Sequence, residues 1–370
     1  MANPFTPTFG VTPPFLVGRD HEIAQVKSAL DGGPGHPARA VFATGSRGMG
    51  KTVLLNALEN AARDAGWVVI SEAARPGLLA ELTATTLPAL LASRAGRAAR
   101  GTVTGVSASV LGFGGSVTRE APTPNAVQPS FRSQLTELAI ALGAQGGGVF
   151  FTMDEAHRSE RSELRTFFQV IQHAFREGLP VAVASAGLPW AVEAVLRDDV
   201  LTFLRRAQRW NLGPVPDQLV ASALREPIIA AGRSISRPAL DLAVATVRGH
   251  PFLIQSVGYE LWDAVPEKEA IGLAEARAAV PRAARAASRL MHEPILADLS
   301  PVERRFARAM ADVGTDAVPV DAVARALGVS RGYASKYRAR LIAAEVIEPA
   351  GRGLVRFAVP LLGEHLRGEP

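Results

Sequence analysis

The first part of the chain alternates short apolar runs with segments of helical character. Residues 38–43 and 67–70 are short and mostly apolar, and runs of this length predict buried strands. Residues 52–65, which lie between them, predict a helix. The order strand, loop, helix, strand predicts a βαβ unit. It therefore indicates an α/β fold with a parallel sheet and helices on both faces.

The same pattern continues for some distance and then stops. Three further apolar runs predict strands at residues 148–153, 181–185 and 210–212. After Pro214 the strand pattern ends, and residues 216–298 predict several helices, which would form a helical lid. Within an insertion at 95–130, residues 101–117 alternate like a hairpin, but they indicate no function.

The last part of the chain has a pattern of its own. Ser300, Pro301 and Glu303 form a capping box with proline at the first helical position, so a helix begins there. Two more helices are predicted at 320–327 and from Ser330 to Ala343. Strands at 346–349 and 354–357 follow, around a glycine-containing turn. Three helices followed by a hairpin predict a winged helix-turn-helix unit.

Composition limits the kinds of protein that this chain can be. Its 370 residues are enough for two or three domains, and a hydrophobic share of 48% is enough for their apolar cores. Charged residues make up 20% of the chain. The net charge of +5 permits a nucleic-acid partner without requiring one. The sequence contains no cysteine, so disulfides, thiolate metal sites and a cysteine nucleophile are excluded.

These patterns predict four parts: a flexible leader (1–14), an α/β domain (15–215), a helical lid (216–299) and a winged helix-turn-helix domain (300–370). The proline-rich leader lacks the apolar run of a signal peptide. The longest uncharged stretches are interrupted by glycine and hydroxyl residues. We therefore expect a soluble cytoplasmic protein with no membrane partner.

The strongest candidate for chemistry is a glycine-rich loop between a predicted strand and a predicted helix. Its spacing, Gly45-x4-Gly50-Lys51-Thr52, fits the phosphate-binding loop of nucleotide-binding proteins. Glycines let the backbone N–H groups turn toward phosphate oxygens, and the following helix adds its positive end. A chance match in a glycine-rich chain is the alternative, and the strand and helix on either side argue against it. The residues expected around ATP or ADP are Gly45, Ser46, Arg47, Gly48, Met49, Gly50, Lys51, Thr52 and Val53.

A second candidate follows the apolar run at 148–153. Asp154 would bind Mg²⁺ together with the hydroxyl of Thr52, while Lys51 contacts the phosphates and Glu155 polarises the attacking water. Alternatively, the two carboxylates only cap a helix. The sequence Asp154-Glu155-Ala156-His157 also matches a helicase motif, but the chain lacks the second α/β motor domain that such helicases need.

Two further positions are candidates for catalysis. Ser185, at the end of a predicted strand, could hold the attacking water, or it could be an ordinary serine at a strand end. Arg205 or Arg206 could act as an arginine finger across an interface between subunits, or both could be solvated surface residues. Either arginine would imply a homo-oligomer.

The chain resembles the origin-recognition-type AAA+ ATPases and their archaeal-type and STAND-like relatives. The phosphate loop and Asp154-Glu155 contribute to this resemblance. Three further motifs extend it over most of the chain: Phe15-Leu16-Val17-Gly18-Arg19-Asp20-x-Glu22; Leu212-Gly213-Pro214-Val215-Pro216 with Ala223-Leu224-Arg225-Glu226-Pro227; and Gly249-His250-Pro251-Phe252-Leu253.

The resemblance implies further roles. Val17, Gly18 and Arg19 would surround the adenine, Pro251 would contact the nucleotide from the lid, and Ser185 would be the polar sensor. The lid departs from the initiator pattern, because Arg248 precedes the lid glycine where initiators have an arginine after it. In this respect the lid motif resembles the STAND-like pattern.

Basic residues are concentrated in the predicted third helix and hairpin of residues 300–370. This part has eleven Lys or Arg residues against eight acidic ones. The candidates for contact with double-stranded DNA are Arg331, Tyr333, Lys336, Arg338, Arg340 and Arg352. The leading hypothesis is an Mg-dependent ATPase whose nucleotide state controls DNA binding. The alternative is a STAND-like ATP/ADP switch whose winged helix docks on protein.

Overall fold

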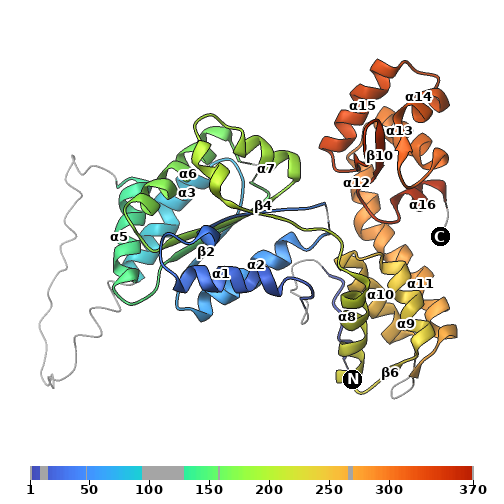
Figure 1. Ribbon diagram of the computed structural model, residues 1–370, viewed down its shortest axis with the longest axis horizontal. Helices are drawn as coiled ribbons and strands as arrows, with labels where there is room; N and C mark the ends of the chain where they lie inside the picture. The colour runs from blue at the N-terminus through green and yellow to red at the C-terminus, as the bar shows by residue number, and fades with distance from the viewer. Residues whose placement is uncertain are drawn as a thin grey trace, which may run out of the picture.

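The computed structural model describes residues 2–8, 16–46, 48–93, 129–156, 159–265 and 270–368. Arg47 and the hairpin expected at 101–117 lie outside this range. Figure 1 shows a sheet flanked by helices, a separate column of helices, and a C-terminal group of elements at one end of that column. No helix within the described ranges is long and apolar enough to cross a membrane.

The sheet has five parallel strands in the order β2-β3-β4-β1-β5. The strands are β1 (Ala40–Thr44), β2 (Val68–Ala73), β3 (Val149–Asp154), β4 (Val181–Gly187) and β5 (Gln208–Asn211). Each coincides with one of the predicted apolar runs, to within a few residues at its ends. The central strands β3 and β4 are buried on both faces, which explains their continuous apolar sequences. The α/β fold predicted for this part is confirmed.

Helices cover both faces of the sheet, as Figure 1 shows. One face packs against α1 (Asp20–Asp31) and α2 (Lys51–Asp64), and the other against α3 (Leu78–Glu81), α5 (Phe131–Gly143) and α6 (Arg161–Arg176). The helix α7 (Pro189–Leu196) and the 3₁₀ turn η4 (Thr202–Arg206) follow β4. On the second face, the ring of Phe151 lies 6.3 Å from that of Phe131 and 5.3 Å from that of Phe167.

In its described residues, the helical lid contains four longer helices and two very short strands. They are α8 (Asp217–Ala230), β6 (Ser234–Ile235), α9 (Arg237–Val247), α10 (Pro251–Asp263), β7 (Ala270–Ile271) and α11 (Leu273–Ala287). A π-helical turn, η5 (Ser288–His292), and α12 (Glu293–Ala297) then lead to the C-terminal elements.

The expectation of a flexible leader is wrong for residues 2–8. Phe5 is only 2% exposed and packs in the core of the lid. Its ring lies against Gly258 of α10, where an added methyl group would come within 2.4 Å of it. Asn3 Nδ2 donates to the backbone oxygen of Tyr259 and to a carboxylate oxygen of Asp263. An isolated Phe in a proline-rich stretch gives no sequence signal of such packing.

The C-terminal elements have the predicted order of helices and strands, with two additions. They are α13 (Pro301–Val313), β8 (Val318–Pro319), α14 (Val320–Leu327), α15 (Arg331–Ala343), β9 (Ile347–Pro349), β10 (Leu354–Phe357) and α16 (Leu362–Arg367). The strands form an antiparallel sheet in the order β8-β10-β9. The predicted capping box of Ser300 and Glu303 is present. Neither β8 nor α16 was expected. The core of this group includes Met291, so it begins before the expected boundary at residue 300.

Candidate functional site

The glycine-rich loop joins the end of β1 to the start of α2. Gly48 and Gly50 have φ angles of +77° and +80°, in the left-handed region that side-chain-bearing residues rarely adopt. A methyl group on Gly45 would come within 2.8 Å of the backbone oxygen of Leu212. The helix α2 begins at Lys51 without a side-chain cap, so its first N–H groups are available to an anion. The loop therefore has the backbone that phosphate binding needs.

Lys51 points back over this loop. Its ammonium donates to the backbone oxygens of Gly45 at 2.5 Å and of Ser46 at 3.0 Å. The positive charge is thus held beside the loop N–H groups, where a phosphate group would bring its negative oxygens. Val53 lies in the first turn of α2 and is half-buried, and Met49 packs partly against the core under the loop.

The hydroxyl of Thr52 and the carboxylate of Asp154 meet across the C-terminal edge of the sheet. Thr52 Oγ1 donates to Asp154 Oδ2 at 2.6 Å, although the residues are 102 positions apart. The other carboxylate oxygen of Asp154 accepts from the N–H of Glu155 at 2.8 Å. A hydroxyl and a carboxylate are the hard oxygen donors that Mg²⁺ prefers, with water and phosphate oxygens completing its shell. The donor set therefore fits this ion.

Glu155 occupies a strained position just after β3. Its φ angle is +51°, which is uncommon for a residue with a side chain, and it is half-buried. Such backbone strain is concentrated at functional sites. Among the described residues, no group of three or more His, Asp or Glu residues could hold a metal ion by itself.

The expected position of Ser185 at a strand end is wrong. Strand β4 continues to Gly187, because the small residues Ala186 and Gly187 extend the apolar run. Ser185 is fully buried, and its hydroxyl donates to the backbone oxygen of Met153 at 3.3 Å. It therefore lies inside the sheet, bonded to β3.

The segment expected around adenine packs between the sheet and the lid. Gly18 has a φ angle of +73°, and a methyl group there would lie 3.3 Å from a methyl carbon of Leu219 in α8. Val17 packs partly against the core of the lid. Arg19 donates to the backbone oxygen of Gly213 at 3.1 Å. Burial lowers the pKa of the Arg19 guanidinium, and the nearby carboxylate of Glu22 partly opposes this shift.

The lid and the C-terminal elements also reach the phosphate loop. A methyl group on Gly48 would come within 2.3 Å of the ring of His250, the N-cap residue of the lid helix α10, and within 3.2 Å of the terminal carbon of Met291. Pro251 lies near Gly50. Sequence reasoning gave His250 no role of its own, although a histidine inside the lid motif was the available signal.

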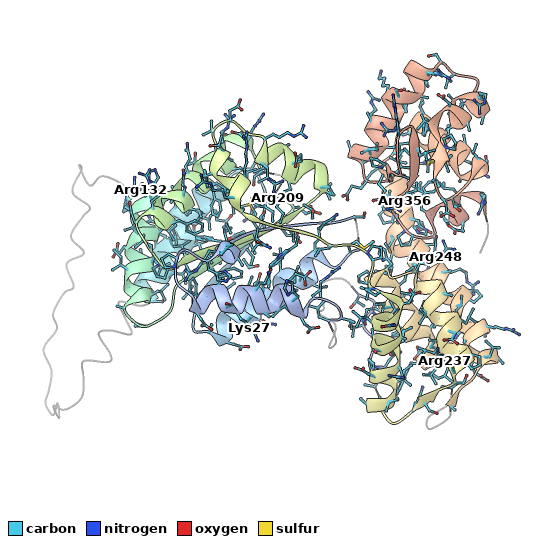
Figure 2. All side chains as sticks on the ribbon, viewed as in Figure 1. Lys27, Arg132, Arg209, Arg237, Arg248 and Arg356 are labelled. Carbon is cyan, nitrogen blue, oxygen red and sulfur yellow. The ribbon has the colours of Figure 1, made fainter. Side chains whose placement is uncertain are left out.

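The contact from the C-terminal elements comes from the strand β9. Ser46 Oγ donates to Glu348 Oε2 at 3.2 Å, and Glu348 Oε1 accepts from Arg356 Nε at 2.5 Å. Figure 2 shows Arg356 on the side of the C-terminal group that faces the sheet. The sequence offered no signal for this contact, because 302 positions separate the two residues.

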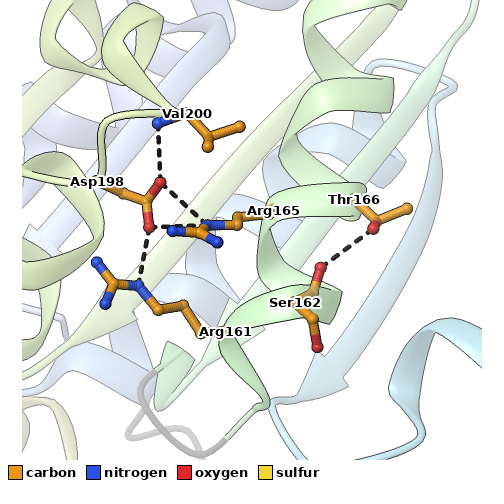
Figure 3. Close-up of polar contacts among 6 residues, drawn as sticks. All are labelled: Arg161, Ser162, Arg165, Thr166, Asp198 and Val200. Carbon is orange, nitrogen blue, oxygen red and sulfur yellow. Dashed lines mark hydrogen bonds and ion pairs between the residues drawn. The ribbon is translucent and has the colours of Figure 1, made fainter.

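Arg205 and Arg206 lie exposed on η4, and Arg205 Nε makes a long bond to the backbone oxygen of Leu196. Near this bond, Asp198 is 1% exposed and accepts from Arg161, Arg165 and the N–H of Val200 at 2.8–3.1 Å (Figure 3). Burial acts to raise the pKa of Asp198, but these hydrogen bonds outweigh it, and the pKa lies below its usual value. Sequence reasoning did not find this cluster.

The candidates for DNA contact lie on α15 and on the turn between β9 and β10. Arg331 is paired with Asp321 at 3.0 Å, and Arg340 lies 3.9 Å from Glu303 and 5.5 Å from the ring of Tyr337. The rings of Tyr333 and Tyr337 are 4.7 Å apart. The residues Tyr333, Lys336, Arg340 and Arg352 are exposed, whereas Arg338 is half-buried with its Nε atom covered.

Comparisons with known proteins agree with the α/β fold and the phosphate-loop motif described above. Residues 16–184 match the model of a family described as AAA ATPase domain, and residues 289–366 match a domain of unknown function. No curated protein matches the chain.

Among solved structures, a Walker-type ATPase of Pyrococcus abyssi is similar, with a TM-score of 0.64 and 15% identity over 95% of this chain and 96% of that one. The ORC2 protein of Aeropyrum pernix has a TM-score of 0.59 and 16% identity, over 97% and 94%. At these identities the two structures support the fold alone.

Proposed function

We propose that this chain, whose residues 16–184 match the AAA ATPase domain family, binds ATP with Mg²⁺ at the phosphate loop and uses its nucleotide state to control its C-terminal elements. The match to this family supports the ATPase activity that the motifs predict. The observation that carries the detailed site is the 2.6 Å hydrogen bond between Thr52 Oγ1 and Asp154 Oδ2. It brings the two magnesium donors together at the end of the loop that would hold the phosphates.

Each residue of the site has a role in this proposal. Mg²⁺, when bound, neutralises charge on the β- and γ-phosphate oxygens. Thr52 and Asp154 hold the ion, and Lys51 donates to phosphate oxygens in place of the carbonyls of Gly45 and Ser46. Glu155 accepts a proton from the attacking water. Val17, Gly18 and Arg19 enclose the adenine, with Pro251 on the side of the lid.

Thr52→Val tests the magnesium site, because valine keeps the branched shape but has no hydroxyl. We expect the gain in affinity for a non-hydrolysable ATP analogue on adding Mg²⁺ to fall by about tenfold or more. Thr52→Ser, which keeps the hydroxyl, should retain the gain. Calorimetric titration with and without Mg²⁺ measures both variants. An undiminished magnesium effect in Thr52→Val would remove Thr52 from the site.

We also infer that residues 300–370 form a winged helix-turn-helix domain that binds double-stranded DNA through α15. Its helices and antiparallel hairpin support this inference, and so does the exposure of α15, in which only Ala334 and Leu341 are buried. Basic side chains on such a helix can reach base edges and phosphates, and Arg352 in the hairpin turn could reach the backbone. The similar structure from Aeropyrum is named as an ORC2 protein.

A second candidate function is a switch in which the C-terminal domain docks on the nucleotide domain. The hydrogen bond from Ser46 to Glu348 favours it, because a carboxylate beside the phosphate loop repels phosphate. In this reading, phosphate binding releases β9 from the loop. An arginine finger from Arg205 or Arg206 of a second copy is compatible with either function.

A further inference from the structure

His250 brings a buried imidazole from the lid onto the centre of the phosphate loop. Its side chain is 2% exposed, and the residue is the N-cap of α10. A methyl group on Gly48 would lie 2.3 Å from Cε1 and 3.0 Å from Nε2 of His250, so the edge of the ring that carries these two atoms faces the backbone of Gly48. The ring nitrogen therefore lies beside the N–H groups that would surround a phosphate.

The backbone before His250 is fixed in a strained conformation. Arg248 and Gly249 have φ angles of +48° and +73°, so a residue with a side chain and a glycine are left-handed in succession. Val215 N–H donates to the Gly249 oxygen at 2.7 Å, and a methyl group on Gly249 would come within 2.5 Å of the Val215 oxygen. Only glycine fits this close approach, which ties the lid to the segment after β5 and positions His250.

Two helix N-termini favour an anion at this place. Two helices, α2 and α10, begin at Lys51 and Pro251, and neither has a side-chain cap on its first N–H groups. Pro251 Cβ is 3.9 Å from a methyl position on Gly50, so the start of α10 lies beside the start of α2. The positive ends of two helix dipoles thus face the same loop, and the His250 ring lies beside Gly48 of that loop.

We propose that His250 is a phosphate ligand contributed by the lid, and that its Nε2–H donates a hydrogen bond to the phosphate chain of the bound nucleotide. The proposal rests on the nucleotide site proposed above. It gives the lid a direct contact with the phosphates, in addition to the contact of Pro251 with the nucleotide.

The test measures affinity for ligands with and without phosphates. Adenosine, ADP and a non-hydrolysable ATP analogue with Mg²⁺ compete against fluorescent ADP on the full chain. We expect His250→Ala to weaken ADP and the ATP analogue by about tenfold, the effect of losing one hydrogen bond to a charged group, and to change adenosine by less than about twofold. His250→Gln, which keeps an N–H donor, should recover most of the loss. His21→Ala, at an exposed histidine of α1, is the matched control.

Three results would overturn the proposal: unchanged ADP and analogue affinities in His250→Ala, an equal loss for adenosine, or no recovery with glutamine. If the alanine variant does not fold, His250→Leu, which fills the space without a donor, replaces it. Lys51→Ala distinguishes a failure of the proposed nucleotide site from a failure of the role proposed for His250. Failure of the wild-type chain to bind ADP would refute the nucleotide site, whereas loss in Lys51→Ala with wild-type affinity in His250→Ala would refute only the role of His250.

Discussion

The phosphate loop and the exposed face of α15 both present positive charge, but they hold it in different ways. Lys51 is fixed by two backbone oxygens, beside two left-handed glycines and an uncapped helix end. On α15 the side chain of Arg331 is 82% exposed, and its one ion pair is with the half-exposed Asp321. A preorganised site stabilises one ligand geometry, whereas a mobile charged surface attracts many anions and is weakened by salt.

This comparison predicts that changes at the sheet edge have the largest effects. Glu155→Gln removes the group proposed to accept a proton from water, but it preserves the size of the side chain. We expect ATP turnover to fall by at least about 100-fold, the lower end for loss of a general base, while ATP binding is retained. Steady-state phosphate release and analogue titration measure the two properties.

The control for this change is Glu160→Gln, at the exposed N-cap of α6. It alters the same charge on the same connection after β3 and should leave turnover near that of the wild type. If Glu155→Gln turned over ATP as fast as the wild type, Glu155 would not be the group that accepts the proton from water. Its strained backbone would then serve another purpose, and the comparison with α15 would no longer include catalysis.

Changes on α15 should have intermediate effects that depend on salt. Lys336→Glu combined with Arg340→Glu reverses two exposed charges, and the half-buried Arg338 is left unchanged. We expect affinity for a duplex to fall by at least about tenfold at low salt. The slope of log affinity against log salt should decrease by roughly 0.9 for each phosphate that the variant no longer neutralises. Fluorescence anisotropy at several salt concentrations measures both quantities.

The matched control reverses Arg197 and Arg237 to Glu, which makes the same change in net charge at the C-cap of α7 and at the start of α9. These side chains are 78% and 84% exposed, so folding should tolerate the change. If this control weakens duplex binding as much as the α15 variant does, the attraction comes from overall charge. If the wild-type chain binds no duplex with either nucleotide, the docking function takes the place of DNA binding.

The two regions also differ in how far the sequence could predict them. The residue types of the loop motif predict its geometry, because glycine readily adopts the left-handed φ angles found at positions 48 and 50, and the buried strands have continuous apolar sequences. On α15 the basic residues could be located, but Asp321 and Glu303, which neutralise part of their charge, come from other helices. That pairing depends on tertiary packing, which periodicity does not contain.

Other features of the site were hidden for the same reason. Ser185 was expected at the end of a strand, but the strand continues through Ala186 and Gly187, and Ser185 is buried within it. His250 and Glu348 reach the loop from the lid and from β9, and Phe5 reaches α10 from the N-terminal segment. Each contact joins segments that are far apart in the chain. A local motif can indicate a residue type, but it cannot indicate its distant partner.

The smallest predicted effect lies at the point where the two regions meet. Glu348→Gln keeps the shape of the side chain beside Ser46 but removes its negative charge. Because the Glu348 side chain is 31% exposed and paired with Arg356, solvent and the ion pair screen its repulsion of phosphate. We therefore expect ATP-analogue affinity to rise only about two- to fivefold.

The matched control for Glu348→Gln is Asp321→Asn, which neutralises the partner of Arg331 in the same C-terminal group. It should leave the affinity unchanged, because no phosphate-loop contact is assigned to it. A rise confined to Glu348→Gln would mean that nucleotide binding works against the contact of β9 with the loop. Nucleotide binding at the phosphate loop would then control when the C-terminal elements, with the exposed charges of α15, are released from the loop. If the wild type and Glu348→Gln bind the ATP analogue with equal affinity, the contact of β9 with the loop is not coupled to nucleotide binding. Duplex binding should then be independent of the bound nucleotide.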